Sequence, residues 1–233
     1  MLGEDRTLDT GSTNQSFTTK LRAPFFDKIR INNPYVIPYT TVMKKIVGKD
    51  FFNRKTETVA KELLGRYLVR KVRLRRGYVV IKERITEVEA YVGPHDLACH
   101  SSKGRTKRNE VMYCEAGTIY VYFVYGMYWM LNIVTEKKEY PAAILIRATE
   151  SASRRIKGPG VLTRELKIDG RLNGKKLGKK TGLWIESDLP AKTGGSANPN
   201  GGKIMRMPRV GVGYAGPIWS KEKLRFVLSQ AKS

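Results

Sequence analysis

An uncharged, strongly apolar block at residues 118–134 limits what this chain can fold into. It falls short of the roughly 20 residues that a membrane-spanning helix needs. It also holds several tyrosines and, near its middle, the turn-forming pair Tyr125 and Gly126. We therefore expect two buried strands, at residues 118–124 and 128–134, joined by this turn.

Other segments predict further strands and a few helices around this hairpin. Residues 67–72 and 78–91 are rich in β-branched side chains and partly alternate in polarity, which predicts a second hairpin. Apolar residues at helical spacing predict a helix at 53–66, for which Gly65 suits a C-terminal cap. Pro159 introduces another short helix. Strands are also expected at residues 142–148, 209–215 and 224–228.

The domain organisation is expected to be simple. Residues 1–41 are rich in Ser, Thr, Asn and Pro, which predicts an N-terminal extension that is at most partly ordered, followed by one domain at 42–233. A lysine-rich segment at 174–182 and a Gly, Ser, Asn and Pro run at 194–202 are predicted to be mobile. Residues 93–117 form a long polar connection, and loops of that length are usually functional or disordered. Its flanking segments favour function.

The charge balance indicates a polyanionic partner. The chain has 44 Lys and Arg against 21 Asp and Glu, a formal net charge of +23. Counterion release from phosphates would make binding steeply dependent on salt. We expect nucleic acid rather than a membrane as the partner. A monomer is expected, because no coiled-coil pattern or obvious apolar patch calls for a second subunit.

The cysteines and histidines argue against a disulfide framework or a zinc site. Nominally, His95, Cys99, His100 and Cys114 make a four-ligand set, but neither cysteine lies in a CxxC motif and the adjacent Cys99 and His100 would point in different directions. We expect no metal and no other cofactor. Residues 1–15 are mostly polar, so no signal peptide is expected, and an intracellular protein with reduced thiols fits best.

Two carboxylates share one face of the strand expected at 78–91. Alternation places Glu87, Glu89 and Tyr91 on the same side. Carboxylates beside apolar residues cost free energy unless they are paired or employed, so one of them is a candidate general base that activates water. Pairing with Arg84 or Arg147 explains the pattern equally well without catalysis.

Tyrosines on both sides of the first hairpin's turn suggest contacts with bases. A tyrosine offers a flat face to an extruded base, and one at the tip, such as Tyr125, can replace that base in the stack. In strands, tyrosines more often pack in the core, which is the alternative for Tyr120 and Tyr122.

A basic loop lies between the carboxylate strand and this hairpin. It suits phosphate contacts, although an ordinary solvated face is the alternative, and the net charge favours phosphate. Its basic residues are Lys103, Arg105, Lys107 and Arg108.

Five segments, taken in order, resemble one enzyme family: RITEVEAYVGPHDLACHSSKGRTKRNEVMY, GTIYVYFVYGMYWMLNIV, AAILIRATE, GPGVLTREL and PRVGVGYAG. They resemble the alkyladenine, or 3-methyladenine, DNA glycosylases over most of residues 53–228. The resemblance implies an α+β fold, a single mixed domain around a curved, mainly antiparallel β-sheet with flanking helices and a protruding β-hairpin. It also implies a monofunctional enzyme of base excision repair.

The reaction that the resemblance implies is hydrolysis of an N-glycosidic bond in double-stranded DNA. A damaged purine such as 3-methyladenine or 7-methylguanine is flipped out of the duplex and released, which leaves an abasic site. Activity on the neutral lesions hypoxanthine and ethenoadenine is left open. No lysine occupies a position that suggests a Schiff base, so strand cleavage is not expected.

Carried over position by position, the resemblance assigns roles to individual residues. Glu89 matches the general base, and Arg147 and the backbone carbonyl of Val210 match groups that hold the water. Tyr125 matches the wedge that enters the minor groove. Asn132 matches a side chain that crowds the exocyclic amino group of guanine. The residues of the implied base pocket are Tyr91, His100, Tyr122 and Asn132.

Two competing functions leave some trace in the sequence. A catalytically silent nucleic-acid-binding protein would keep the basic sheet and the stacking hairpin, but the intact Glu89 argues against it. A helix-hairpin-helix glycosylase is suggested only by the Gly-Pro-Gly at 158–160, and no Lys and Asp pair follows it at suitable spacing.

Overall fold

The computed structural model describes residues 45–188 and 203–229. The predicted extension at 1–41 and the predicted mobile run at 194–202 lie outside these residues, and the domain boundary between residues 41 and 42 stays a prediction.

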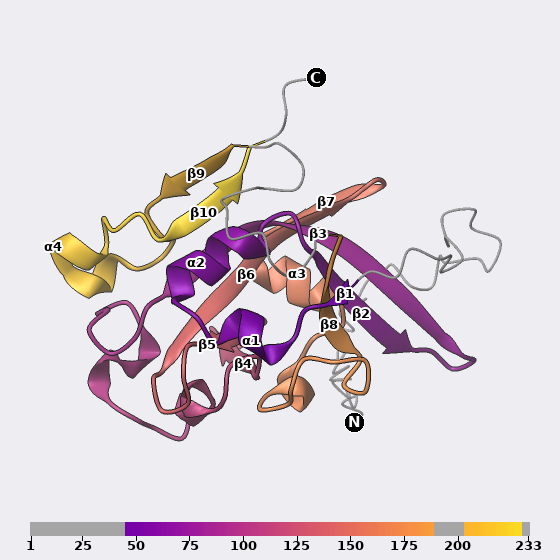
Figure 1. The fold of residues 1–233 in the computed structure, drawn as a ribbon, viewed down its shortest axis with the longest axis horizontal. Helices are drawn as coiled ribbons and strands as arrows, with labels where there is room; N and C mark the ends of the chain where they lie inside the picture. Colours follow the sequence, from indigo (N-terminus) through magenta and orange to yellow (C-terminus); the bar gives the residue numbers. More distant parts are fainter. Residues whose placement is uncertain (1–44, 189–202, 230–233) are drawn as a thin grey trace, which may run out of the picture. The chain divides into compact units, whose positions relative to one another are not determined.

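The described residues form an α+β fold around one open, curved, ten-stranded sheet in which every pairing of the named strands is antiparallel (Figure 1). The strands are β1 (Lys45–Ile46), β2 (Tyr67–Arg73), β3 (Tyr78–Tyr91), β4 (Ile119–Val124), β5 (Tyr128–Thr135), β6 (Ala142–Ser151), β7 (Arg154–Lys157), β8 (Leu183–Ser187), β9 (Ile204–Met207) and β10 (Arg225–Leu228). Their order is β1-β8-β2-β3-β6-β5-β4, with β7 added beside β6 and the β9–β10 pair attached to β3. Both predicted hairpins, β2–β3 and β4–β5, are confirmed.

The helices are short. They are α1 (Lys49–Phe52), α2 (Thr56–Leu63), α3 (Pro159–Glu165) and α4 (Gly216–Trp219), with 3-10 turns η2 (His100–Lys103), η3 (Glu110–Tyr113), η4 (Gly170–Leu172) and η5 (Gly213–Ala215). The two predicted helices are confirmed as α2 and α3. Gly65 follows α2 with a φ of 83°, but Leu64 before it is already extended and the Gly65 N–H donates to Ile85 O of β3 at 2.8 Å, so Gly65 turns the chain towards the sheet and does not cap the helix. No helix in residues 45–188 or 203–229 is long and apolar enough to cross a membrane.

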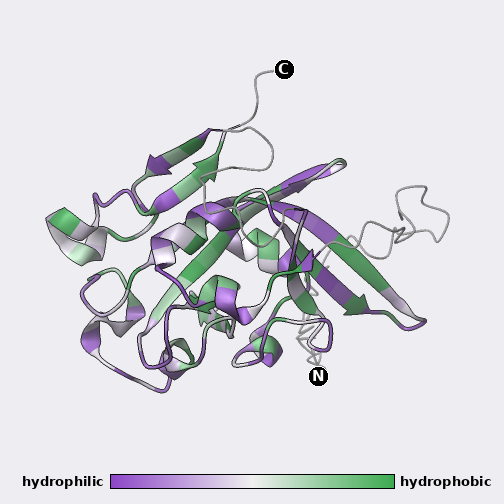
Figure 2. Ribbon diagram, in the orientation of Figure 1, coloured by the Kyte–Doolittle hydropathy of each residue, from purple (hydrophilic) through white to green (hydrophobic). Residues whose placement is uncertain are grey.

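The core lies between the sheet and helices α2 and α3. The apolar face of α2 buries Val59, Ala60 and Leu63 against β3 and β6, while Leu162 of α3 packs against β5 and β6 (Figure 1). Strand β6 is hydrophobic along most of its length (Figure 2). Each fully buried aliphatic side chain stabilises the fold by roughly 1.5–3 kcal/mol. This packing makes the middle of the sheet a rigid support for β3.

Two expectations about the chain after α3 are wrong. Residues 209–215 do not form a strand, because the segment turns through Gly211 at a φ of 75° and ends in η5, while Arg209 is buried as an ion-pair partner. The lysine-rich segment at 174–182 is not loose. Its backbone is tied to β4, with Gly174 N donating to Ile119 O at 2.8 Å and Ile119 N donating to Lys175 O at 2.7 Å.

An irregularity in the pairing of β3 with β6 affects how Arg147 of β6 meets the carboxylates of β3. The register pairs Ile85 with Thr149, then Glu87 with Ala148, then Val88 with Ile146, so Thr86 and Arg147 are both passed over. Such bulges bend a strand locally and change the direction of a side chain. Here the result is that Arg147 contacts two carboxylates of β3.

Candidate active site

The carboxylate of Glu89 is the most constrained group near the end of β3. Its side chain is fully buried. The Val210 N–H donates to Oε1 at 2.8 Å, and the Tyr91 hydroxyl donates to Oε2 at 3.0 Å. Nη1 of Arg147 lies 3.3 Å from Oε2. A carboxylate has about four acceptor positions, so these three donors leave room for roughly one more.

The pKa of Glu89 reflects a balance between burial and this donor set. Burial raises the pKa of the Glu89 carboxyl, and Arg147, the Val210 N–H, the Tyr91 hydroxyl and Arg209 offset this rise only in part. Burial and the neighbouring Glu89 raise the pKa of Tyr91 well above its usual value, so Tyr91 keeps its proton and remains a donor. Ionised Glu89 is therefore a stronger base than an exposed glutamate.

Glu87, on the same strand, is held differently. Its Oε1 accepts hydrogen bonds from Arg147 Nε at 2.9 Å and from Arg225 Nη1 at 3.2 Å. The sequence left open whether Arg84 or Arg147 pairs with the β3 carboxylates, and Arg147 does so, whereas Arg84 pairs with Glu150 at 3.2 Å. Glu87 is thus bound by two arginines, while Glu89 faces one arginine and two neutral donors.

An aromatic cluster lies between η2 and β4. The ring of His100 is 4.6 Å from that of Tyr122, and its Nδ1 is 2.9 Å from the hydroxyl of Tyr120. Burial and the nearby Arg108 lower the pKa of His100 to about 4, so its imidazole is neutral at pH 7. Tyr120 is a core residue, 1% exposed, whereas Tyr122 and Tyr91 are only partly buried. The alternative of core packing is therefore correct for Tyr120.

Asn132 lies on β5, opposite Tyr120 in the register. It is buried, and its Nδ2 donates to the carbonyl oxygens of Tyr120 and Met130, both at 3.3 Å. These contacts fix the orientation of the side chain beneath the aromatic cluster.

Tyr125 stands apart from these buried groups at the β4–β5 turn. It is 86% exposed and adopts a φ of 52°, in the left-handed region that few non-glycine residues occupy. Met127 in the same turn is exposed too. Gly126 follows with a φ of 65° and Met127 N donates to Val124 O at 3.1 Å, so positive φ at two successive residues gives the tight turn that suits a β-hairpin and leaves the Tyr125 side chain at its tip.

The basic loop contacts this hairpin at one point. Nη2 of Arg108 donates to Phe123 O at 3.4 Å, and its guanidinium lies 5.5 Å from the centre of the Tyr122 ring. Arg105 is paired with Glu139 at 3.1 Å and stacks on Tyr113. Lys103 and Lys107 are exposed.

The four residues considered as zinc ligands do not gather. Cys99 Sγ is 3.0 Å from Ser101 Oγ, and the ring of His95 packs against Trp219. Within the described ranges 45–188 and 203–229, no group of three or more His, Cys, Asp or Glu residues is arranged to hold a metal ion.

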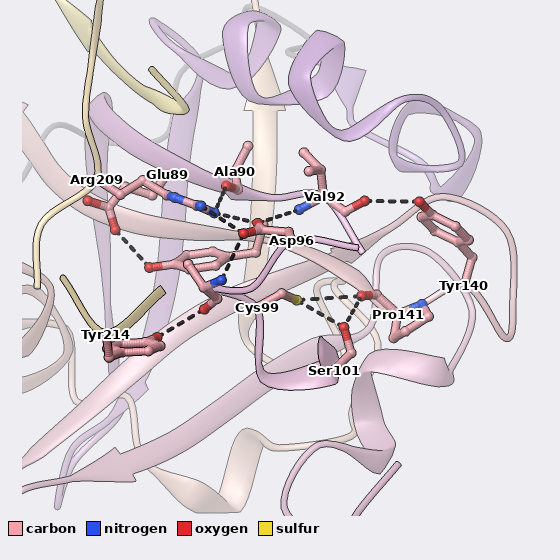
Figure 3. Close-up of polar contacts among 12 residues, drawn as sticks. Glu89, Ala90, Val92, Asp96, Cys99, Ser101, Tyr140, Pro141, Arg209 and Tyr214 are labelled. Carbon is pink, nitrogen blue, oxygen red and sulfur yellow. Dashed lines mark hydrogen bonds and ion pairs between the residues drawn. The ribbon is translucent and has the colours of Figure 1, made fainter. Parts of the chain in front are cut away.

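Two charged residues that the sequence analysis did not single out lie beside the site. Asp96 and Arg209 form an ion pair in which both side chains are 0% exposed (Figure 3). Neither has a local sequence pattern that marks it, because the pair joins a loop to a segment 113 residues away.

Comparisons with known proteins agree on one family. The family model described as methylpurine-DNA glycosylase matches residues 50–232. A protein of Legionella pneumophila (strain Paris) is 44% identical over 189 residues, which cover 80% of this chain and 95% of that protein. A protein of Methanocella arvoryzae is 43% identical over 187 residues, covering 73% and 86%. Both carry the name "Putative 3-methyladenine DNA glycosylase".

Proposed function

Since the chain belongs to the methylpurine-DNA glycosylase family, and is therefore a DNA repair hydrolase that cleaves N-glycosyl bonds, we propose that Glu89 activates the water that releases the damaged purine. The observation that carries this proposal is the buried Glu89 carboxylate with three donors and a raised pKa. Its remaining acceptor position takes a proton from water. Arg147 and the carbonyl of Val210 hold that water for attack on the anomeric carbon.

Glu89 is a better candidate for the base than Glu87. Two arginines bind Oε1 of Glu87, so this carboxylate is committed to ion pairs that join β3 to β6 and β10. The Arg147 guanidinium also favours the ionised form of Glu89 and would stabilise the hydroxide character that the attacking water acquires.

The proposed substrate is an alkylated purine, such as 3-methyladenine or 7-methylguanine, flipped out of duplex DNA. Such a base is cationic and a good leaving group, and it stacks favourably against aromatic rings. Tyr91 and His100 form one wall of the proposed pocket and Tyr122 the other, and because the rings of His100 and Tyr122 lie 4.6 Å apart, these walls must separate to admit a base. A neutral His100 adds no positive charge that would repel this base. Asn132 restricts access for guanine by crowding its exocyclic amino group.

The proposed DNA contacts lie on the side of the protein that carries the proposed base pocket. Tyr125 enters the minor groove and fills the space left by the extruded nucleotide, and Arg105, Lys107 and Arg108 contact the phosphates. The protein acts as a monomer inside the cell, with the glycosylase domain at residues 42–233. Activity on the neutral lesions hypoxanthine and ethenoadenine stays open, and a duplex with hypoxanthine tests it.

The test is a base-release assay on duplexes that contain one 7-methylguanine, one hypoxanthine or no lesion. We expect release of the methylated base and strand breaks only after alkali treatment, since the product is an abasic site. An intact 7-methylguanine duplex after long incubation would refute the proposal. Strand breaks without alkali would refute its monofunctional mechanism.

A further inference from the structure

Asp96 and Arg209 form a two-point ion pair that is completely enclosed. Nη2 of Arg209 is 2.8 Å from Oδ1 of Asp96, and Nη1 donates to Oδ2 (Figure 3). Nη1 also donates to the carbonyl of Ala90 on β3 at 2.9 Å. The guanidinium lies over the ring of Tyr91, 4.8 Å from its centre. Arg209 is therefore fixed against both the backbone and a side chain of β3.

Asp96 holds a different part of the chain. Its carboxylate accepts hydrogen bonds from Val92 N at 3.2 Å and from Ala98 N at 3.0 Å. The loop between these residues leads directly into η2 and His100. The ion pair thus joins three segments: the end of β3, the loop at 92–98, and the residues that follow β9 (Figure 3).

Both neutral donors to Glu89 depend on this arrangement. Val210, whose N–H is 2.8 Å from Glu89 Oε1, is the residue directly after Arg209. Tyr91, whose hydroxyl is 3.0 Å from Oε2, lies beneath the guanidinium. The side chain of Val210 itself is 51% exposed, and Gly211 follows it with a φ of 75°, so the apolar packing of this segment begins only at Val212, which is buried with Ala98.

Stability alone does not explain a buried ion pair, because apolar residues of similar volume in the same place often stabilise a fold as well or better. An ion pair with two parallel hydrogen bonds does fix orientation. We propose that the Asp96–Arg209 pair is a positioning device for the base of the reaction, which holds the Val210 N–H and the Tyr91 hydroxyl against Glu89. This inference rests on the proposed role of Glu89.

The charged and titratable groups around Glu89 define what loss of the pair would change. Arg147 of β6 and Tyr91 of β3 contact the carboxylate, and Tyr122 of β4 and Arg209 interact with it electrostatically. The Glu87–Arg225 pair lies alongside, between β3 and β10. Without Arg209, Glu89 loses a nearby positive charge and the fixed Val210 N–H, both of which favour its ionised form. The acid limb of the rate profile then moves to higher pH.

The experiment measures single-turnover release of 7-methylguanine from a duplex by the full chain, from pH 5 to pH 9, together with the Kd for that duplex. The first variant is Asp96→Asn. The second combines Asp96→Asn with Arg209→Met, and this double variant leaves no buried charge without a partner. We expect the rate at neutral pH to fall about 100-fold, as displacement of reacting groups by about 1 Å can cause. The Kd should stay unchanged for both variants, and in the double variant, which lacks the Arg209 charge, the acid limb should shift to higher pH. Arg209→Lys, which keeps the charge but loses the two-point geometry, should recover part of the rate.

The matched control is the ion pair between buried Glu83 on β3 and partly buried Arg154 on β7, whose Nε–Oε1 distance is 2.8 Å. Glu83→Gln with Arg154→Met should leave rate and pH profile as in the wild type. A folded Asp96 and Arg209 double variant with wild-type rate and acid limb would overturn the proposal. A double variant that does not fold would overturn it too, because the pair would then serve the fold. Activity of the wild type together with inactivity of Glu89→Gln shows that the proposed function stands independently of this result.

Discussion

At the end of β3, charged side chains are buried and each carboxylate has several donors, whereas the β4–β5 turn presents apolar side chains to solvent. Glu89 and Arg209 have almost no exposed surface, while Tyr125 is 86% exposed. The first region is held by hydrogen bonds from four different segments of chain, whereas the turn adopts a local hairpin geometry. With the roles proposed above, the chemical step and the capture of DNA would be served by separate parts of the molecule.

This separation has a measurable form. Changes in the buried region should lower the rate of base release while leaving DNA affinity intact, because those groups act on the transition state. Changes at the β4–β5 turn and in the basic loop should weaken DNA binding while leaving the rate of base release in the saturated complex intact.

The largest effect is expected for Glu89→Gln. Loss of a general base should lower single-turnover base release by about 1,000-fold, while the Kd for lesion DNA stays the same. A parallel loss of affinity would break the contrast between the two regions. Thermal unfolding offers an independent check. Because the folded-state pKa of Glu89 is raised, its ionised form costs stability as pH rises above the usual carboxyl range, so the neutral variant should unfold at an equal or higher Tm at pH 8.

The pH dependence of the wild-type rate of base release should report the titration of Glu89. Glu89 must be ionised to accept a proton, so the rate should fall by about tenfold per pH unit below its folded-state pKa. Since that pKa is raised, the fall should begin above the usual range of a glutamate carboxyl. A single-turnover profile that stays flat down to pH 4.5 would contradict the assignment.

A smaller effect, on binding instead of rate, is expected for Tyr125→Ser. Loss of one stacking ring should weaken binding to a lesion duplex by about tenfold, as measured by titration at fixed salt. The rate within the saturated complex should change much less. Tyr78→Ser is the matched control, because Tyr78 is also exposed, at 61%, beside the turn of the other hairpin. Equal loss of affinity in both variants would remove the special role of the β4–β5 turn.

The smallest effect is expected for Lys107→Ala in the basic loop. Removing one phosphate contact should lower the slope of log Kd against log salt by about one and weaken lesion and undamaged duplexes equally. Base release from the saturated complex should be unaffected. A salt slope equal to that of the wild type would place Lys107 outside the DNA interface.

Local patterns predicted the parts of the fold that local forces determine. Alternation and a turn signal were sufficient for the β2–β3 and β4–β5 hairpins, since strand periodicity and turn chemistry act over a few residues. The same reasoning failed at 209–215, where Val210, Val212 and Tyr214 alternate as in a strand but Arg209 is drawn into the interior by Asp96. Strands β1, β7, β8 and β9 were not predicted, although β10, of similar length, was.

Local patterns likewise predicted only part of the candidate site. Alternation placed Glu87 and Glu89 on one face of a strand, but did not decide which of them is the base. That distinction depends on the bulge between β3 and β6, which brings Arg147 to both carboxylates, and on Val210 from a distant segment. Contacts between residues more than 50 positions apart have no local signature, so Asp96 and Arg209 were not identified at all.

The left-handed backbone at Tyr125 has a kinetic consequence. It fixes, during folding, the direction in which the side chain leaves the chain, so under the proposed wedge role little backbone entropy would remain to be lost when the tip meets a duplex. A repair enzyme meets very many intact base pairs for each damaged one. In that proposed role, a tip that is already shaped would test each of them within one brief encounter, without a separate ordering step at every site.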